Sequence, residues 1–382
     1  MKNILKFAII VFSFAVFMIG NFNYKSANIC YGEPQNLTTA KSMCVMEKTS
    51  KRILYEKDSD IKLPQASLTK IITAIVAIEN NGDLNRIIEI PKEATGIEGS
   101  SIYLKAGEHL SILDLLYGLM LRSGNDSAVA LALATSGSVE NFIDLANEFC
   151  RKIGAINTHL VTCNGLDDKN HYTTAKDMAL ITCYALNNVT FREIVGTVSH
   201  DIPNELGKSE FRHLKNKNKL LSTMEGATGV KTGYTRNAGR CFVGSASKNG
   251  MEVVCVVLNC GPMFEETQAL LTKALNEFEM VHFIEPFDNF DIPIDNAIQQ
   301  NVKLCVKNGF SYPLTQTEKS NINIITNLPE MLTAPIENDC AVGEIQIFLA
   351  NDLIFSEKIY TINAVEGNDY LSKLTKILKG MA

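Results

Sequence analysis

One stretch, PQASLTKIITAIVAIEN at residues 64–80, constrains the fold of this chain more than any other. After Lys70 it is apolar on nearly every side, which is typical of a helix buried in a core or a membrane. A hydroxyl, Ser67, and an amine, Lys70, stand three residues apart at its start, so a helix places them on one face. An amine held against apolar walls loses the hydration of its charged form, and its pKa falls. The stretch therefore predicts a serine nucleophile beside a lysine general base.

The same Ser-x-x-Lys spacing occurs again at Ser245 and Lys248. This second pair lies beside a predicted hairpin turn, where a solvated lysine is the simpler interpretation. Sequence context, and not the spacing alone, singles out Ser67.

The chain has 382 residues, which is enough for two or three domains. Its net charge of -6 argues against a nucleic-acid partner, because such binding depends on clustered Lys and Arg. No His/Cys cluster has metal-ligand spacing, so we expect neither a metal nor another cofactor.

Residues 1–32 predict an export signal. Lys2 and Lys6 precede the apolar run FAIIVFSFAVFMI, residues 7–19, and polar residues follow it. The run is too short for a comfortable membrane span, although an uncleaved anchor is the alternative and the cleavage site stays open. Either way we expect an exported, extracytoplasmic protein.

Ten cysteines in an exported chain would normally suggest disulfides. Here they are scattered without a CxxC motif, and several stand in apolar runs such as MEVVCVVLNC, where cysteine behaves as a small hydrophobe. We therefore expect mostly free, buried thiols.

Residues 38–280 mix strand and helix patterns. Strands are predicted within residues 44–60 and, as a hairpin turning at 248–250, within residues 239–260. Helices are predicted within residues 110–135, interrupted by Ser-Gly-Asn, and at TQALLTKALNEFEMV, residues 267–281. Strands at both ends with helices between them indicate an α/β fold without a regular βαβ repeat.

The remainder of the chain has a different pattern. Residues 283–369 show short alternating segments that predict a small β-rich domain. In the last segment, YLSKLTKILKGMA at residues 370–382, a helical wheel gathers the apolar side chains on one arc and three lysines on another. Such a helix suits contact with an anionic membrane surface, and packing on the β-rich domain is the alternative.

Two further motifs extend the chemistry of Ser67 and Lys70. Ser123-Gly124-Asn125 supplies a second hydroxyl and a carboxamide, and Lys231-Thr232-Gly233 precedes an apolar strand. The order Ser-x-x-Lys, Ser-x-Asn, Lys-Thr-Gly is the arrangement of the penicillin-recognising serine acyl-transferases.

The chain resembles the D-alanyl-D-alanine carboxypeptidases, the low-molecular-weight penicillin-binding proteins of bacterial cell walls. The resemblance rests on PQASLTKIITA, GLMLRSGNDSAVALA, NHYTTAKDMA and GVKTGYTRNAGRCFVGSA, and it covers about residues 40–280. It implies a β-lactamase-like (transpeptidase-like) mixed sheet with a helical subdomain, followed by the β-rich domain that many members carry. The implied substrate is the pentapeptide stem of peptidoglycan, and the implied inhibitors are β-lactam antibiotics.

The resemblance also implies a role for each matching residue. Ser67 would be the nucleophile, Lys70 its base and Ser123 a proton relay. Asn125 would bind the peptide amide of the substrate, and Lys231 and Thr232 would bind its terminal carboxylate. Gly233 would keep the edge strand open to the substrate backbone. The N–H groups of Ser67 and Tyr234 would form the oxyanion hole.

Some positions depart from the family pattern. The segment NCGPMFEET, residues 259–267, lacks the arginine that certain relatives use on the carboxylate, so binding would depend more on Lys231 and Thr232. Cys163-Asn164-Gly165-Leu166 replaces a common Pro-His-Gly-Leu. We interpret His171 and Tyr172 as structural.

Three other functions share these motifs. A class A-like β-lactamase would use Ser-Asp-Asn and a deacylating glutamate, neither of which the sequence shows. A peptidoglycan endopeptidase or transpeptidase would use the same residues on cross-linked peptide. A non-catalytic wall-binding protein could keep the fold, although the intact motifs weigh against it.

Overall fold

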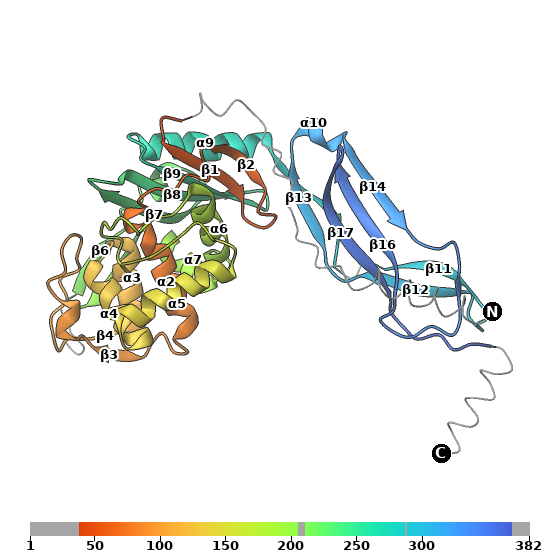
Figure 1. The fold of residues 1–382 in the computed structure, drawn as a ribbon, viewed down its shortest axis with the longest axis horizontal. Coiled ribbons are helices and arrows are strands. Elements are labelled where there is room, and N and C mark those ends of the chain that lie inside the picture. The colour runs from red at the N-terminus through yellow and green to blue at the C-terminus, as the bar shows by residue number, and fades with distance from the viewer. Residues whose placement is uncertain (1–37, 205–210, 287–288, 369–382) are drawn as a thin grey trace, which may run out of the picture.

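The computed structural model describes residues 38–204, 211–286 and 289–368, and these form two units in succession along the chain (Figure 1). The first unit contains a mixed arrangement of sheet and helices, and the second is β-rich. The expected fold class is confirmed. The predicted export signal (1–32) and C-terminal helix (370–382) lie outside the described residues.

A five-stranded antiparallel sheet forms the frame of the first unit, in the order β2-β1-β9-β8-β7. Its strands are β1 (Ser42–Glu47), β2 (Ile53–Lys57), β7 (Ala227–Thr235), β8 (Gly239–Lys248) and β9 (Met251–Leu258). The predicted hairpin is confirmed, and its turn residues Asn249 and Gly250 both have positive φ, as the tight two-residue turn requires. Strand β9 is buried on both faces, which explains why it is apolar at every position except Glu252.

The helices of the first unit lie on both faces of this sheet. They are α2 (Thr69–Asn80), α3 (Ile112–Leu121), α4 (Asn125–Ser136), α5 (Val139–Lys152), α6 (Ala175–Ala185), α7 (Val189–Gly196), α8 (Leu220–Thr223) and α9 (Met263–Glu277). Short elements join them: the 3-10 turns η2 (Ala66–Leu68) and η3 (Lys92–Ala94), and the strand pairs β3 (Ile87–Glu89) with β4 (His109–Ser111) and β5 (Ser199–Pro203) with β6 (Phe211–Lys215).

Helix α2 is the centre of the helical subdomain. It is buried continuously from Thr69 to Ile78, because α3, α4, α5, α6 and α7 all pack against it. The absence of a polar face in this stretch therefore reflects a core position, as predicted.

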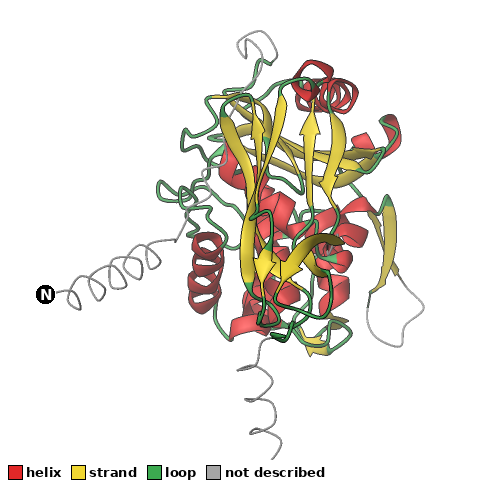
Figure 2. Ribbon diagram, turned by 90° about the vertical axis from the view of Figure 1, so that its right-hand side faces the viewer, coloured by secondary structure: helices red, strands yellow, loops and turns green. Residues whose placement is uncertain are grey.

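Helix α9 covers the opposite face of the sheet from the other long helices, as the two views in Figures 1 and 2 show. The prediction that helix extends to residue 281 is wrong at its end. Helix α9 stops at Glu277, Phe278 is extended, and β10 (Glu279–Ile284) pairs with β13 (Phe310–Leu314) of the second unit. Long-range pairing thus overrides the local helical spacing, and the predicted domain boundary at 280–283 falls within β10.

The second unit is built on a six-stranded sheet in the order β14-β16-β17-β12-β11-β15. Its elements are β11 (Asn289–Asp295), β12 (Asn301–Val306), α10 (Gln316–Lys319), β14 (Ile322–Asn327), β15 (Leu332–Thr333), β16 (Ala341–Leu349) and β17 (Asp352–Thr361). It has its own apolar core, to which β12, β16 and β17 contribute.

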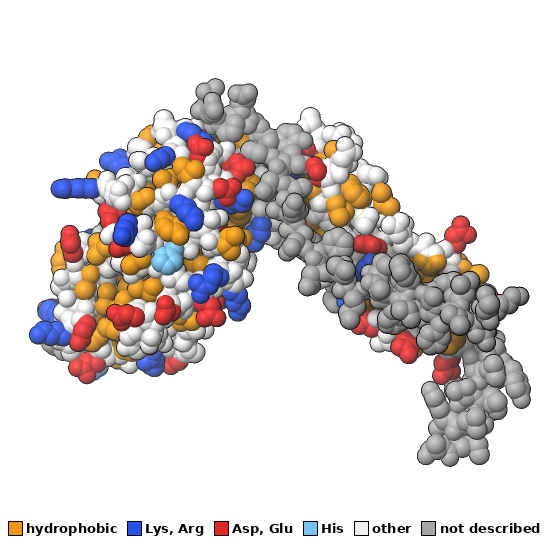
Figure 3. Space-filling model, in the orientation of Figure 1, with side chains coloured by type: hydrophobic (Ala, Val, Ile, Leu, Met, Phe, Trp, Pro, Cys, Tyr) orange, Lys and Arg blue, Asp and Glu red, His pale blue; other side chains and the backbone are white. Residues whose placement is uncertain are grey.

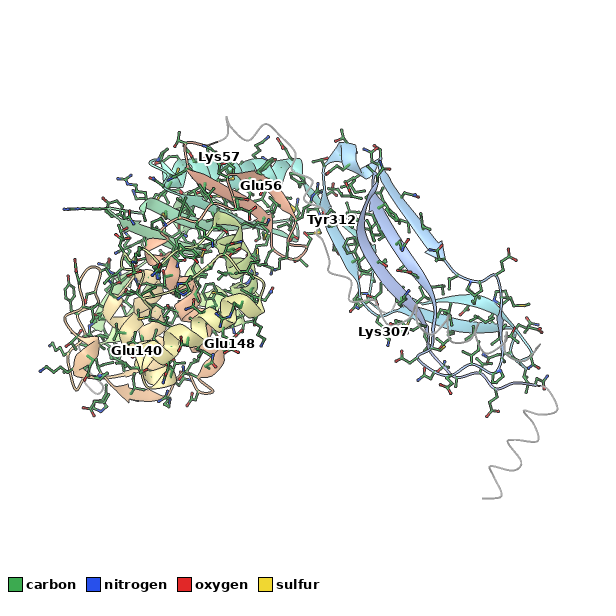
Figure 4. All side chains as sticks on the ribbon, viewed as in Figure 1. Glu56, Lys57, Glu140, Glu148, Lys307 and Tyr312 are labelled. Carbon is green, nitrogen blue, oxygen red and sulfur yellow. The ribbon has the colours of Figure 1, made fainter. Side chains whose placement is uncertain are left out.

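Arg52 joins the two units. It is buried between the rings of Phe278 and Tyr312, with its guanidinium carbon 5.3 Å and 5.0 Å from the two ring centroids. Its guanidinium also donates to the carbonyl of Pro313 and pairs with the buried carboxylate of Glu318. Tyr312 is labelled at this junction in Figure 4. The buried ion pair of Arg52 with Glu318 therefore links the β-rich unit to the residue that precedes β2.

On the face drawn in Figure 3, basic and acidic side chains are interspersed over the first unit. No helix in the described part of the chain has the length and apolar character needed to span a membrane. The nine cysteines in that part are unpaired, and all but Cys340 are buried.

Candidate active site

Ser67 stands in the 3-10 turn η2, immediately before α2. Ala66 has a φ of 47°, a conformation that L-residues rarely adopt and that often marks a functional site. The turn leaves Ser67 half-buried while Lys70, one turn later, is fully buried. The Lys70 amine lies 3.1 Å from the Ser67 hydroxyl oxygen. The predicted nucleophile and base are therefore in direct contact.

Three oxygens surround the Lys70 amine. Besides Ser67 Oγ, they are Asn125 Oδ1 at 2.7 Å and the backbone carbonyl of Asn164. Burial lowers the pKa of Lys70 to about 7, against a smaller opposing effect of Cys163. A neutral amine has two N–H donors and one lone pair. Donation to Asn125 and Asn164 leaves that lone pair directed at the Ser67 hydroxyl, which is the geometry of a general base.

Ser123-Gly124-Asn125 interrupts α3 and α4, as predicted. Ser123 is buried with a φ of 63°, and Asn125 is the first residue of α4. The Asn125 N–H donates to the carbonyl of Ser100 at 2.7 Å, and its side-chain amide donates to the carbonyl of Glu98. Asn125 is therefore held from two sides. Among the described contacts of the Lys70 amine, Ser123 is not a partner, so the relay suggested for Ser123 is not preformed in this state.

Lys231-Thr232-Gly233 lies on β7, which is an edge strand of the sheet. Lys231 is buried, with its amine donating to the carbonyl of Thr232 at 3.0 Å. Burial, with further contributions from Lys70 and Lys217, holds its pKa well below the usual lysine range. An anionic ligand would offset the unfavourable effect of burial and of these two lysines on the charge of Lys231.

Lys217 is a site residue that the sequence did not reveal. Its amine donates to Ser100 Oγ at 3.0 Å, and its charge lowers the pKa of both Lys70 and Lys231. Nothing in HLKNKNKLL distinguishes it from Lys215 and Lys219. Only the fold brings it beside the motifs.

Two glycines allow the backbone to close around Ser67. A Cβ on Gly233 would lie 3.2 Å from the Ser67 nitrogen, and one on Gly165 would overlap the Ala66 carbonyl oxygen at 2.0 Å. Gly165 also has a φ of 88°. Strand β7 and the loop at residues 161–166 therefore both touch the nucleophile turn. Tyr234, which follows Gly233, is exposed beside them.

The second Ser-x-x-Lys pair does not form a site. Residues three apart on a strand point to opposite faces, so Ser245 is buried against the Thr228 hydroxyl at 2.7 Å while Lys248 is exposed and donates to Asn276. The interpretation of Lys248 as a solvated residue is confirmed. Within the described residues, no group of three or more His, Cys, Asp or Glu side chains is arranged to hold a metal ion.

The fold and the site together define a penicillin-recognising serine acyl-transferase: a buried Ser–Lys pair, a Ser-x-Asn corner and a Lys-Thr-Gly edge strand. Comparison with protein families agrees. The peptidase S11 family, described as D-alanyl-D-alanine carboxypeptidase, matches residues 31–261, and the C-terminal domain of penicillin-binding protein 5 matches residues 278–367. The chain belongs to the D-alanyl-D-alanine carboxypeptidase family.

Individual relatives match either most of the chain or about three fifths of it. The chain is 32% identical to the D-alanyl-D-alanine carboxypeptidase DacC of Escherichia coli over 88% of this chain and 86% of DacC. It resembles the crystal structure of penicillin-binding protein 5 from Haemophilus influenzae with a TM-score of 0.75 and 26% identity, covering 88% of this chain and 99% of that one. A mutant of the Streptomyces K15 DD-transpeptidase matches with a TM-score of 0.59 and 29% identity, over 62% of this chain and 97% of that one.

Proposed function

We propose that this protein removes the terminal D-alanine from peptidoglycan pentapeptide stems through an acyl-enzyme on Ser67. The class of activity is that of its family: it is a penicillin-sensitive serine D-Ala-D-Ala carboxypeptidase. The observation that supports the assignment to Ser67 is its hydroxyl oxygen 3.1 Å from a fully buried amine whose pKa is about 7.

In the proposed acylation step, Lys70 takes the proton from the Ser67 hydroxyl as Oγ attacks the carbonyl carbon of the penultimate D-alanine. The C–O bond forms, and the developing oxyanion faces the N–H groups of Ser67 and Tyr234. When the C–N bond breaks, the proton passes to the departing amine of the terminal D-alanine. Ser123 is our candidate for relaying it, by turning its hydroxyl toward the site once substrate is bound.

In deacylation, a water molecule attacks the ester and Lys70 again serves as base. Its proton then returns to the Ser67 oxygen as the shortened peptide leaves. One amine can serve both steps because a pKa near 7 allows it to accept and to donate a proton at neutral pH.

The substrate would be held at two ends. Asn125 is our candidate for hydrogen bonding the stem amide, and Gly233 leaves the edge of β7 open to the peptide backbone. Lys231 and Thr232 would bind the terminal carboxylate. Lys70 and Lys217 disfavour the charge on Lys231, and a bound anion would relieve that unfavourable interaction, which would offset the missing arginine in residues 259–267.

The experiment that tests this function is incubation of the purified protein with a pentapeptide ending in two D-alanines. We expect release of one D-alanine per peptide. Cleavage or formation of cross-linked peptide would instead indicate an endopeptidase or transpeptidase, which the match to a DD-transpeptidase structure makes worth testing. Rapid hydrolysis of penicillin would indicate a β-lactamase. No reaction with the peptide or with penicillin would indicate a non-catalytic wall-binding protein.

We predict that labelled penicillin forms a covalent ester on Ser67. Mass spectrometry of the digested, labelled protein identifies the modified peptide. The matched comparison is Ser245, which has the same spacing to a lysine but lies buried against Thr228. A label on Ser245 or Ser123 would show that the nucleophile has been misassigned.

We also propose the domain assignment and location. Residues 1–32 would direct export, residues 38–280 would form the catalytic domain, residues 283–369 the β-rich domain, and residues 370–382 would contact the outer face of the cytoplasmic membrane. The support for membrane contact is the sequence pattern alone: one apolar arc beside Lys373, Lys376 and Lys379.

Vesicle binding tests the membrane contact. We expect the mature chain to sediment with anionic phospholipid vesicles, and a chain ending at Asn368 to remain in solution with its penicillin acylation intact. Neutral vesicles are the control, because the lysines add attraction only to anionic lipid. Equal sedimentation of the two chains would show that residues 370–382 do not provide the membrane contact.

A further inference from the structure

Two segments far apart in sequence meet at the nucleophile. One is the turn of residues 65–70, and the other is the loop of residues 161–166. The Asn164 carbonyl of this loop accepts a hydrogen bond from the Lys70 amine. The position of that carbonyl decides where the lone pair of the amine points. Whatever holds the loop against the turn therefore also sets the geometry of the base.

His171 lies buried between these two segments. Its Nδ1 accepts the backbone N–H groups of Val161 and Thr162, at 3.0 Å and 3.3 Å, where the loop begins. An Nδ1 that accepts two N–H groups carries no proton, so the proton of the neutral ring is on Nε2. The tautomer thus follows from the surrounding backbone.

The other ring nitrogen faces the turn. Nε2 lies 2.7 Å from Thr69 Oγ1, which can accept its proton and donate in turn to the Ala66 carbonyl at 2.8 Å. The side-chain amide of Gln65 lies 3.1 Å from the same nitrogen. Gln65 precedes Ser67 in the chain and Thr69 follows it. The ring therefore contacts the nucleophile turn on both sides of Ser67.

The orientation of the Gln65 amide supports this arrangement. With its nitrogen toward Nε2–H two donors would meet, and its Oε1 is buried without a partner among the described residues. Exchanging the two amide atoms, which occupy nearly equivalent positions, pairs Oε1 with Nε2–H and removes the meeting of two donors, and the amide nitrogen then takes the position that has no partner among the described residues. The Nε2 proton is then shared between Thr69 and Gln65.

The ring stays neutral under working conditions. The pKa of His171 is lowered to about 4, mainly by burial, with smaller lowering effects of the His159 and Lys70 charges and an opposing effect of Asp168. Protonation would turn Nδ1 into a donor facing two N–H groups. The hydrogen-bonding pattern therefore requires the neutral form.

We propose that His171 is a positioning residue for acylation. Its neutral imidazole ties the loop that presents the Asn164 carbonyl to the turn that presents Ser67, and so holds the Lys70 lone pair on the hydroxyl. This inference rests on the proposed roles of Ser67 and Lys70. It differs from a purely structural role because it predicts a loss of rate that is separable from a loss of stability.

Two substitutions of His171 each keep one of its two contacts, either the one to the loop of residues 161–166 or the one to the turn of residues 65–70. The amide oxygen introduced by His171→Asn stands near the position of Nδ1 and can still accept from the loop, but nothing reaches the turn. The amide nitrogen introduced by His171→Gln stands near the position of Nε2 and can donate to Thr69, but the loop loses its acceptor. We expect each to slow acylation by a fluorescent penicillin about 10- to 100-fold, with the dissociation constant of the non-covalent complex unchanged.

Thr69→Val tests the connection from the other side. It removes the hydroxyl at the turn without changing the shape of the side chain, so His171→Asn should slow acylation little further in that background. The matched control is His159→Gln. The backbone of His159 pairs with that of Tyr172 in the same loop region, and among the described residues its side chain is hydrogen bonded to the Asn170 carbonyl and not to the nucleophile turn, so its replacement should leave acylation at the wild-type rate.

Amide hydrogen exchange gives a readout that does not depend on activity. Protection of the Val161 and Thr162 amides should fall in His171→Gln and persist in His171→Asn. If the wild-type protein does not acylate on Ser67, the proposed function fails. The exchange of the Val161 and Thr162 amides still tests whether His171 holds the loop. The proposal is overturned if both His171 variants lose thermal stability but acylate at the wild-type rate, if their effects add to that of Thr69→Val, or if exchange at residues 161 and 162 does not change.

Discussion

Replacing Lys70 by alanine should lower the rate of acylation by penicillin about 1,000-fold, together with release of D-alanine. General-base catalysis contributes factors of this size, and every substrate requires the same proton transfer from Ser67. Wild-type acylation should rise as the pH passes about 7 and level off above it, because burial lowers the pKa of Lys70 to that value and only the neutral amine accepts a proton. Single-turnover labelling across pH measures both effects.

The matched control for this prediction is Lys248→Ala. It removes the lysine of the second Ser-x-x-Lys pair, which is exposed and donates to Asn276 of α9. Its acylation rate should equal that of the wild type. Acylation of Lys70→Ala at a near-native rate would show that another group is the base.

Replacing Lys231 by alanine should lower kcat/KM for a D-alanyl-D-alanine peptide about 30-fold or more. Losing one partner of a buried, charge-assisted contact costs about 2–5 kcal/mol, and each 1.4 kcal/mol is a factor of ten. Because the loss concerns the substrate's terminal carboxylate, it should shrink to within about threefold for the same peptide with an amidated C-terminus. Steady-state kinetics on the two peptides provide the test.

The control for Lys231 is Lys215→Ala, which removes an exposed lysine of β6 that does not influence the pKa of Lys231. A similar loss on both peptides would mean that Lys231 supports the fold or the chemistry instead of the carboxylate. A Lys70→Ala effect on both peptides alongside a selective Lys231→Ala effect would establish the division of labour between the two amines.

Local spacing and its sequence context were sufficient to predict that Ser67 and Lys70 lie in contact and that two helices meet at Ser123. A Ser and a Lys three residues apart at the start of a helix must share a face, and an unbroken apolar run must be buried. The hairpin at residues 239–260 followed from its Asn-Gly turn in the same way. The β-rich unit was predicted from alternation over short segments, and the structure contains it.

Local spacing failed where distant segments compete. The residues after Glu277 have helical spacing, yet they form β10 because β13 offers a strand partner some 30 residues away. The same limit explains the loop at 161–166. Its departure from the family pattern was visible in the sequence, but the use of the Asn164 backbone carbonyl was not, since every residue has one.

The sequence by itself determined which groups are candidates for the site: helical geometry places Ser67 beside Lys70, and the motif singles out Lys231. Only the tertiary structure decided how they are held. Lys70 meets Asn125 and Asn164 across 55 and 94 residues, and Gln65 meets His171 across 106. The physical reason is that covalent spacing fixes side-chain neighbours over one or two turns, whereas burial and hydrogen bonding between distant segments depend on how the whole chain packs.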